Sequence, residues 1–228
     1  MKRLFPIFAL VTLGLLSWGL YMALVVAPTE ATMGDVQRIF YYHVPSAWSA
    51  FLCFLINAIA SIWYLMKRGM KSDAMALASA EVGVVFCTIV LVTGPIWAKP
   101  VWGIWWTWDA RLTSTLVLWL IYVAYLMLRR FSASGRAPVL AATLAIFGFF
   151  DVPFVYLSIR IFRTQHPQPV MGGGENSGLD PVMAHAFLWN LLAFTCYCGL
   201  LIWMRYRMQV AEQAIEEAHA ERALGEGA

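Results

Sequence analysis

Six long apolar runs divide the chain, and they restrict its fold more than any other feature of the sequence. A helix needs about 20 apolar residues to cross the hydrocarbon core of a bilayer. Backbone in lipid must satisfy its own hydrogen bonds, which favours helices. We therefore predict an all-α integral membrane protein with six transmembrane helices. The predicted spans are Phe5–Val26, Trp48–Met66, Met75–Gly94, Leu112–Leu128, Pro138–Ile159 and Met183–Met204.

The composition agrees with this fold class. Of the 228 residues, 61% are hydrophobic and only 13% are charged, whereas a soluble domain carries about 25% charged residues. The first apolar run resembles a secretory signal, but it is longer than a typical signal core and lacks a small-x-small cleavage site, so we expect a retained helix. No basic, aromatic-rich patch indicates nucleic acid.

The basic residues predict the orientation. Six spans place both termini on one side, and the positive-inside rule then assigns that side to the cytoplasm. The basic residues on the side of the termini are Lys2, Arg3, Lys67, Arg68, Lys71, Arg129, Arg130, Arg136, Arg205, Arg207 and Arg222. Those on the other side are Arg38, Lys99, Arg111, Arg160 and Arg163. We expect residues 1–208 to form the membrane domain and 209–228 a charged cytoplasmic tail.

This orientation leaves three segments on the outer side, Ala27–Ala47, Pro95–Arg111 and roughly Arg160–Val182. The middle one, between the third and fourth spans, contains Trp102-Gly103-Ile104-Trp105-Trp106-Thr107-Trp108-Asp109. In a helix Trp102, Trp105, Trp106 and Asp109 would share one face, and Trp108 would point elsewhere. Three indoles on one face suit a flat aromatic ligand or the edge of a membrane. Four tryptophans packed around Gly103 and followed by Asp109 and Arg111 favour the ligand over a simple anchor.

Histidines in or beside the outer segments are candidate metal ligands. His43 and His166 lie next to prolines at the same face as the tryptophans, and His185 lies at the start of the sixth span. Two imidazoles can hold one haem iron while indoles cover the porphyrin. Zinc is the alternative, but the outer segments lack cysteine. The outer basic residues suit the haem propionates, because arginine pairs well with carboxylates.

The cysteines and the intramembrane carboxylates complete the sequence features. The chain has no Cys-x-x-Cys motif, so covalently attached haem is excluded, and its four cysteines are expected to be packed thiols. Glu81 and Asp151 fall within predicted spans, where each is either a neutral packing residue or part of a proton path. Pro153 predicts a kink beside Asp151.

The segment Lys99–Ser114 resembles the tryptophan-rich "WWD" signature of membrane proteins that handle haem in cytochrome c assembly. The six spans and the run Tyr42–Pro45 narrow the resemblance to the haem exporter protein C (CcmC) type of cytochrome c maturation system I. His166 matches the second outer histidine of that family. Ile161-Phe162-Arg163 and Gln165 depart from the family's pattern around this position, which leaves His185 as a rival ligand.

The resemblance implies a function. Proteins of this family hold haem b at the periplasmic surface of the bacterial inner membrane and load it onto the haem chaperone CcmE. They work beside the ABC-type subunits CcmA and CcmB and the small membrane subunit CcmD. The chain has no P-loop, so we expect any ATP hydrolysis to belong to a partner and the chain itself not to be an enzyme.

By this resemblance His43 and His166 ligate the iron. The residues implied to bind the porphyrin are Trp102, Gly103, Trp105, Trp106, Trp108, Asp109 and Arg111. The alternatives are a haem-conducting transporter subunit and a haem-bearing membrane electron carrier. No span has a histidine near its midplane, which argues against the electron carrier.

Overall fold

A computed structural model of the chain describes residues 4–132, 135–162, 164–167 and 178–226. These residues form helices and no β-strand, and six helical segments are long and apolar enough to cross a membrane. The predicted fold class, an all-α protein with six spans, is thereby confirmed. The helices are α1 (Leu4–Tyr21), α2 (Phe40–Lys67), α3 (Met70–Trp102), α4 (Ala110–Phe131), α5 (Ala137–Phe149), α6 (Asp151–Ile161) and α7 (Pro181–Glu226).

Two helices extend into segments that we predicted to be outer links. A 3-10 turn over Asp35–Ile39 leads directly into α2, so the predicted link Ala27–Ala47 is wrong beyond its first residues. Two polar side chains in this part are buried against the bundle; Gln37 is 3% exposed and His43 9%. Likewise α3 continues to Trp102 through Pro95 and Pro100.

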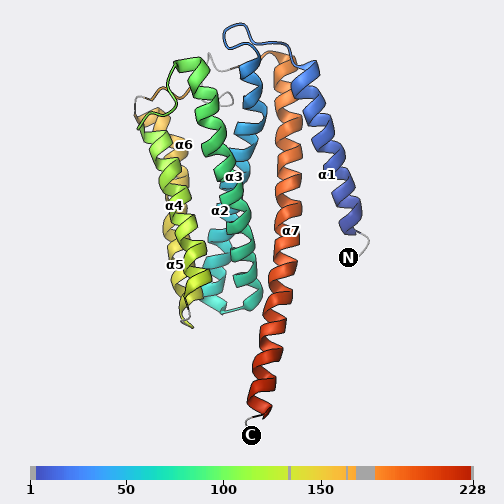
Figure 1. The fold of residues 1–228 in the computed structure, drawn as a ribbon, viewed down its shortest axis with the longest axis vertical. Coiled ribbons are helices and arrows are strands. Elements are labelled where there is room, and N and C mark those ends of the chain that lie inside the picture. Colours follow the sequence, from blue (N-terminus) through green and yellow to red (C-terminus); the bar gives the residue numbers. More distant parts are fainter. Residues whose placement is uncertain (1–3, 133–134, 163, 168–177, 227–228) are drawn as a thin grey trace.

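The helices form two groups around a central hairpin (Figure 1). The hairpin consists of α2 and α3, which share the most extensive contact in the molecule. On one side α7 packs against both of them, and α1 packs against α7 at the edge of the bundle. On the other side α4 packs against α3, and α5 against α2. Both chain ends lie toward the same end of the bundle, and α7 projects beyond the other helices.

The fifth span is broken where the sequence predicted a kink. α5 ends at Phe149 and α6 begins at Asp151, with Pro153 in its first turn. Below the break α5 packs against both α2 and α4, whereas above it α6 packs mainly against α4. The break therefore leaves room beside α2 and α3 at the end of the bundle away from the termini.

Carboxylates inside the bundle pair with arginines from other helices. Asp73 on α3 accepts two hydrogen bonds of 2.7 Å from Arg129 on α4. Glu81 on α3 accepts bonds of 2.7 and 2.9 Å from Arg205 on α7. The ion pair argues against Glu81 as a neutral packing residue. Asp151 remains without a hydrogen bond to its buried Oδ2 within the described ranges.

The predicted tail is not set apart by a break in the backbone. α7 runs uninterrupted past Met208 to Glu226, and most side chains after that point are exposed. The charged residues 209–226 are thus a helical extension of the last span. Gln213 in this extension reaches Asp73 with a hydrogen bond of 3.5 Å, which ties the start of the extension to α3.

Candidate functional site

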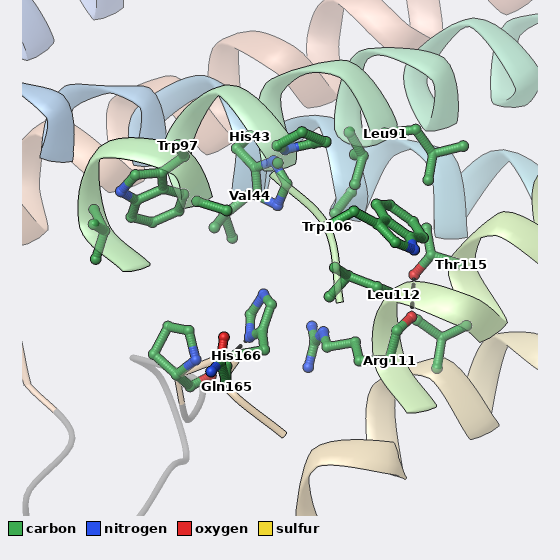
Figure 2. A pocket seen from close by; sticks show the side chains of 18 of the residues that line it. His43, Val44, Leu91, Trp97, Trp106, Arg111, Leu112, Thr115, Gln165 and His166 are labelled. Atoms are coloured by element: carbon green, nitrogen blue, oxygen red, sulfur yellow. Dashed lines mark hydrogen bonds between the residues drawn. The ribbon is translucent and has the colours of Figure 1, made fainter. Parts of the chain in front are cut away.

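A cavity of about 300 Å³ lies at the end of the bundle opposite the termini. Its walls come from α2, α3, α4 and α6, and from the link before α7. Small and apolar side chains make most of the surface, among them Ala47, Val90, Gly94 and Val155. Its titratable side chains come from three places, His43 on α2, Arg111 on α4 and His166 in the link (Figure 2).

His43 is held by a side chain of the neighbouring helix. Its Nδ1 lies 2.8 Å from the Oγ1 of Thr93 on α3. The Thr93 hydroxyl donates to the carbonyl oxygen of Ile89 at 2.7 Å, so its lone pair accepts the hydrogen of His43 Nδ1. Nε2 of His43 therefore carries the free lone pair. The ring also meets Trp97 edge to face, with centroids 5.8 Å apart, which fixes its orientation further.

His166 has the same tautomer for a different reason. Its Nδ1 lies 2.9 Å from the carbonyl oxygen of Pro167, which can only accept a hydrogen bond. Nδ1 is therefore the protonated nitrogen, and Nε2 is again free. The backbone of the link is fixed by Thr164, whose Oγ1 accepts a hydrogen bond of 3.1 Å from the amide of His166.

The two imidazoles face each other across the cavity, with Arg111 beside His166 (Figure 2). Burial lowers the pKa of His166 to about 4, and the positive charge of Arg111 acts in the same direction. The hydrogen bond to Pro167 opposes the shift only in part. At neutral pH His166 is thus an uncharged base, the form that binds a metal ion.

Arg111 brings a positive charge to the cavity. Its Nη1 is buried and has no hydrogen-bond partner within the described ranges. The residue follows Asp109, the N-cap of α4, whose carboxylate accepts a 2.9 Å hydrogen bond from the amide of Leu112 and a 3.1 Å bond from the Thr107 hydroxyl. Asp109 thereby fixes the start of α4, from which Arg111 points into the cavity.

The tryptophan stretch is not a helix, so its side chains do not share one face. α3 ends at Trp102, and Gly103 follows in the left-handed region with φ of 76°, a conformation that glycine adopts without strain. Residues 104–109 then form an irregular link. Trp102 and Trp106 line the cavity, whereas Trp105 and Trp108 lie outside it and are 58% and 76% exposed.

Trp97 is a cavity residue that the sequence reasoning missed. It lies on α3 with its buried Nε1 unpaired among the described residues, as is Nε1 of Trp106. A helical spacing identifies it in retrospect, because Val90, Gly94, Trp97 and Val101 follow one another at intervals of four, three and four residues, and all line the cavity. We had ended the third span at Gly94. Met33, in the link before α2, also reaches the cavity.

The remaining sequence candidates lie elsewhere. His185 is exposed on α7, away from the lining. Arg38 ion-pairs with Asp35 and donates a 2.6 Å hydrogen bond to the carbonyl oxygen of Ala23. Lys99 donates to the carbonyl oxygen of Gly103 at the end of α3. The outer segment that we assigned to Arg160–Val182 contains Arg163, which is outside the described residues.

These features define a class of protein. The described residues form a multi-pass membrane protein with an apolar cavity into which two uncharged imidazoles and one guanidinium with an unpaired Nη1 point. They contain no group of three or more histidine, cysteine, aspartate or glutamate side chains able to hold a metal ion. The donor set fits a flat apolar porphyrin with an axially ligated iron and carboxylate side chains.

Comparison with known proteins assigns the family. The chain belongs to the heme exporter protein C (CcmC) family, whose family model matches residues 1–221. It is 36% identical over 206 residues to heme exporter protein C of Bradyrhizobium diazoefficiens, covering 87% of this chain and 78% of the relative. The Escherichia coli K12 protein of the same name is 36% identical over 183 residues, which are 79% of this chain and 73% of the relative.

A relative from a plant matches a shorter part of the chain. It is the putative cytochrome c biosynthesis ccmC-like mitochondrial protein of Marchantia polymorpha, 35% identical over 152 residues. The match covers 67% of this chain and 64% of the relative.

Proposed function

We propose that the chain holds haem b in this cavity and passes it to the haem chaperone CcmE during the biogenesis of c-type cytochromes. Haem is the cargo of the protein, and the chain makes or breaks no bond in it. The observation that carries the proposal is the pair of free Nε2 atoms, on His43 and His166, that face each other across one cavity.

His43 and His166 are the proposed axial ligands. A metal-bound histidine usually donates its other ring N–H to a nearby acceptor, which orients the ring and increases the basicity of the ligand. Both residues already have such an acceptor, the Thr93 hydroxyl for His43 and the Pro167 carbonyl for His166. His43 stands on α2, and His166 stands in the link after α6, where the Thr164 hydroxyl accepts a hydrogen bond from its backbone amide.

The rest of the lining supports the porphyrin. Trp102 and Trp106 give apolar, rigid walls, and Trp97 adds a third indole on the side of His43. Arg111 is the proposed partner of a propionate, since its unpaired Nη1 would gain a charge-assisted hydrogen bond from a carboxylate. Asp109 acts by positioning Arg111 through the N-cap of α4 and does not touch the cargo.

The location of the cavity fits delivery to an acceptor outside the cytoplasm. It lies away from the end of the bundle where the chain termini and most basic residues are found, and by the positive-inside rule this supports a cavity on the periplasmic side of the inner membrane. A site there is within reach of a periplasmic chaperone. We further propose that the chain works with the ABC-type subunits CcmA and CcmB and with CcmD, and that ATP hydrolysis belongs to those partners.

An absorption spectrum tests the transfer. The chain is purified in detergent after expression alone and after co-expression with CcmE. We expect the chain expressed alone to retain haem with a Soret band, and the co-expressed chain to retain less while the chaperone acquires haem. A chain that never carries haem, or a chaperone that is loaded equally without it, would contradict the proposal.

A further inference from the structure

The tryptophan signature has two exposed members that the haem cavity does not use. Trp105 and Trp108 are 58% and 76% exposed, and Ile104 beside them is 39% exposed. Exposed apolar side chains that lie together commonly mark a surface that binds a protein or a membrane. We call these three side chains the outward triad. They belong to one link, so one partner can cover them together.

The length of α4 gives the depth of this link in a membrane. α4 has 22 residues, which at 1.5 Å per residue is about 33 Å, close to the thickness of the hydrocarbon core of about 30 Å. Asp109 caps one end of α4, and Arg129 and Arg130 stand at the other. Charged groups at both ends place those ends at the two membrane boundaries. Trp108 immediately precedes α4, so it lies at the boundary.

The link also runs along the side of the bundle. Figure 1 shows it descending at the edge, from the upper end of α3 to the lower start of α4. α3, with 33 residues and a length of about 50 Å, rises well above the level at which α4 begins. The link therefore returns from the end of α3, where Lys99 lies beside Trp105, to the level of the bilayer boundary at Trp108 and the start of α4.

The backbone of the link is fixed at its two ends. Lys99 donates a 2.8 Å hydrogen bond to the carbonyl oxygen of Gly103, and its ammonium lies 6.0 Å from the centre of the Trp105 ring. Asp109 fixes the other end through Leu112 and Thr107. The rings of Trp106 and Trp108 meet edge to face at 5.7 Å, which couples an indole inside the cavity to one outside it.

From this geometry we infer that the signature has two separate binding functions, and that the outward triad with Lys99 binds the interfacial region of the lipid bilayer at the cavity end. Indole rings prefer the carbonyl and headgroup level of a bilayer, where the ring is in apolar surroundings and the N–H is hydrated. The Lys99 ammonium is placed to meet lipid phosphates. The wall of the cavity that contains Trp106 is thus anchored to the membrane through Trp108.

Fluorine NMR of the full chain tests this directly. The protein is labelled with fluorotryptophan and reconstituted in phosphatidylcholine nanodiscs without partners, and resonances are assigned from single Trp→Phe variants. We expect a lipid with a nitroxide near the carbonyl end of its acyl chain to abolish the Trp105 and Trp108 resonances. A soluble gadolinium chelate should leave both visible. The inference would be overturned if the chelate alone abolished both resonances, or if neither reagent affected them.

A second experiment measures haem content. The division of the tryptophans into cavity residues and outward residues rests on the proposed function, and this experiment tests the two claims separately. The double variant Trp105→Ala/Trp108→Ala should retain haem at the wild-type level. The matched variant Trp102→Ala/Trp106→Ala should lose most of it. Equal loss in both would show that the outward residues also bind the cargo and would contradict the division. If the wild-type chain takes up no haem, the proposed function fails, while the NMR result still decides whether lipid covers the triad.

Discussion

The Nδ1 of His43 lies 2.8 Å from the hydroxyl oxygen of Thr93, and that hydroxyl is itself bonded to the carbonyl oxygen of Ile89 at 2.7 Å. This arrangement sets the tautomer of His43 without any charged group. It joins α2 to α3 at the cavity and leaves Nε2 free. The relationship identifies Thr93 as a residue that acts on the proposed cargo through His43.

The first prediction concerns this contact. In Thr93→Val the shape is kept, but Nδ1 of His43 loses its acceptor. Loss of such an outer partner typically weakens metal binding about 10- to 100-fold, so we expect a corresponding loss of haem affinity in a spectroscopic titration. Thr143→Val is the matched control, because Thr143 also bonds a carbonyl one turn back but is on the exposed face of α5. Equal affinities for the two variants would contradict the role of Thr93.

The second prediction concerns Arg111. We expect Arg111→Gln to weaken haem binding about 10- to 100-fold, since a hydrogen bond to a charged group contributes about 1.5–3 kcal/mol. The effect should disappear when the titration uses the dimethyl ester of haem, which has no carboxylates. The variant and the wild type should bind the ester with the same affinity. If the variant binds the ester more weakly than the wild type, by the same factor as for haem, then Arg111 acts on the cavity in general and not on a propionate.

The third prediction tests the close approach of α2 and α3. A Cβ at Gly83 would lie 2.6 Å from the ring of Phe54, which is stacked on Tyr122 with centroids 3.8 Å apart and has little freedom to move. We expect Gly83→Ala to destabilise the protein by about 1–3 kcal/mol through overpacking. Thermal unfolding in detergent measures the change. Gly14→Ala is the control, because no described atom outside its own stretch of helix lies within 4 Å of its Cβ position, and it should not lower the melting temperature.

The fourth prediction compares the two ion pairs of α3. The side chains of Arg129 and Asp73 are 13% and 6% exposed, whereas those of Arg205 and Glu81 are both 30% exposed. Removing one partner of a buried pair costs about 3–5 kcal/mol, because the other charge remains unpaired. Asp73→Asn should therefore lower the melting temperature more than Glu81→Gln does. The reverse order would show that burial does not determine the cost here.

The fold could be predicted from the sequence because a segment that spans a bilayer must be long, apolar and able to satisfy its own backbone hydrogen bonds. Six apolar runs of the right length leave few alternatives to six helices, and Pro153 beside Asp151 correctly located the break between α5 and α6. The residues at which the helices begin and end were harder to predict from the sequence. Tyr41 and His43 look like outer-link residues in the sequence, but they are buried in α2 because neighbouring helices cover them.

The site was predicted in part. His43, His166, Arg111, Trp102 and Trp106 were singled out from the sequence, and the structure brings them to one cavity. The helical spacing that grouped Trp105 with Trp102 failed, because Gly103 ends α3 and the following residues are not helical. Trp97 was missed because the predicted third span ended at Gly94, before the helical spacing reached it. Thr93 was missed because its role depends on a contact between α2 and α3, which a periodicity within one segment does not reveal.

The claim that two histidines from different elements share one iron is tested most directly by the spectrum of the haem-loaded protein. Purified wild type is compared with His43→Ala, with His166→Ala and with the double variant, using His185→Ala as the control for an exposed histidine. We predict that each single change shifts the Soret band and weakens haem retention, that the double variant loses both ligands, and that His185→Ala matches the wild type. A double variant that keeps the wild-type haem spectrum would contradict the account.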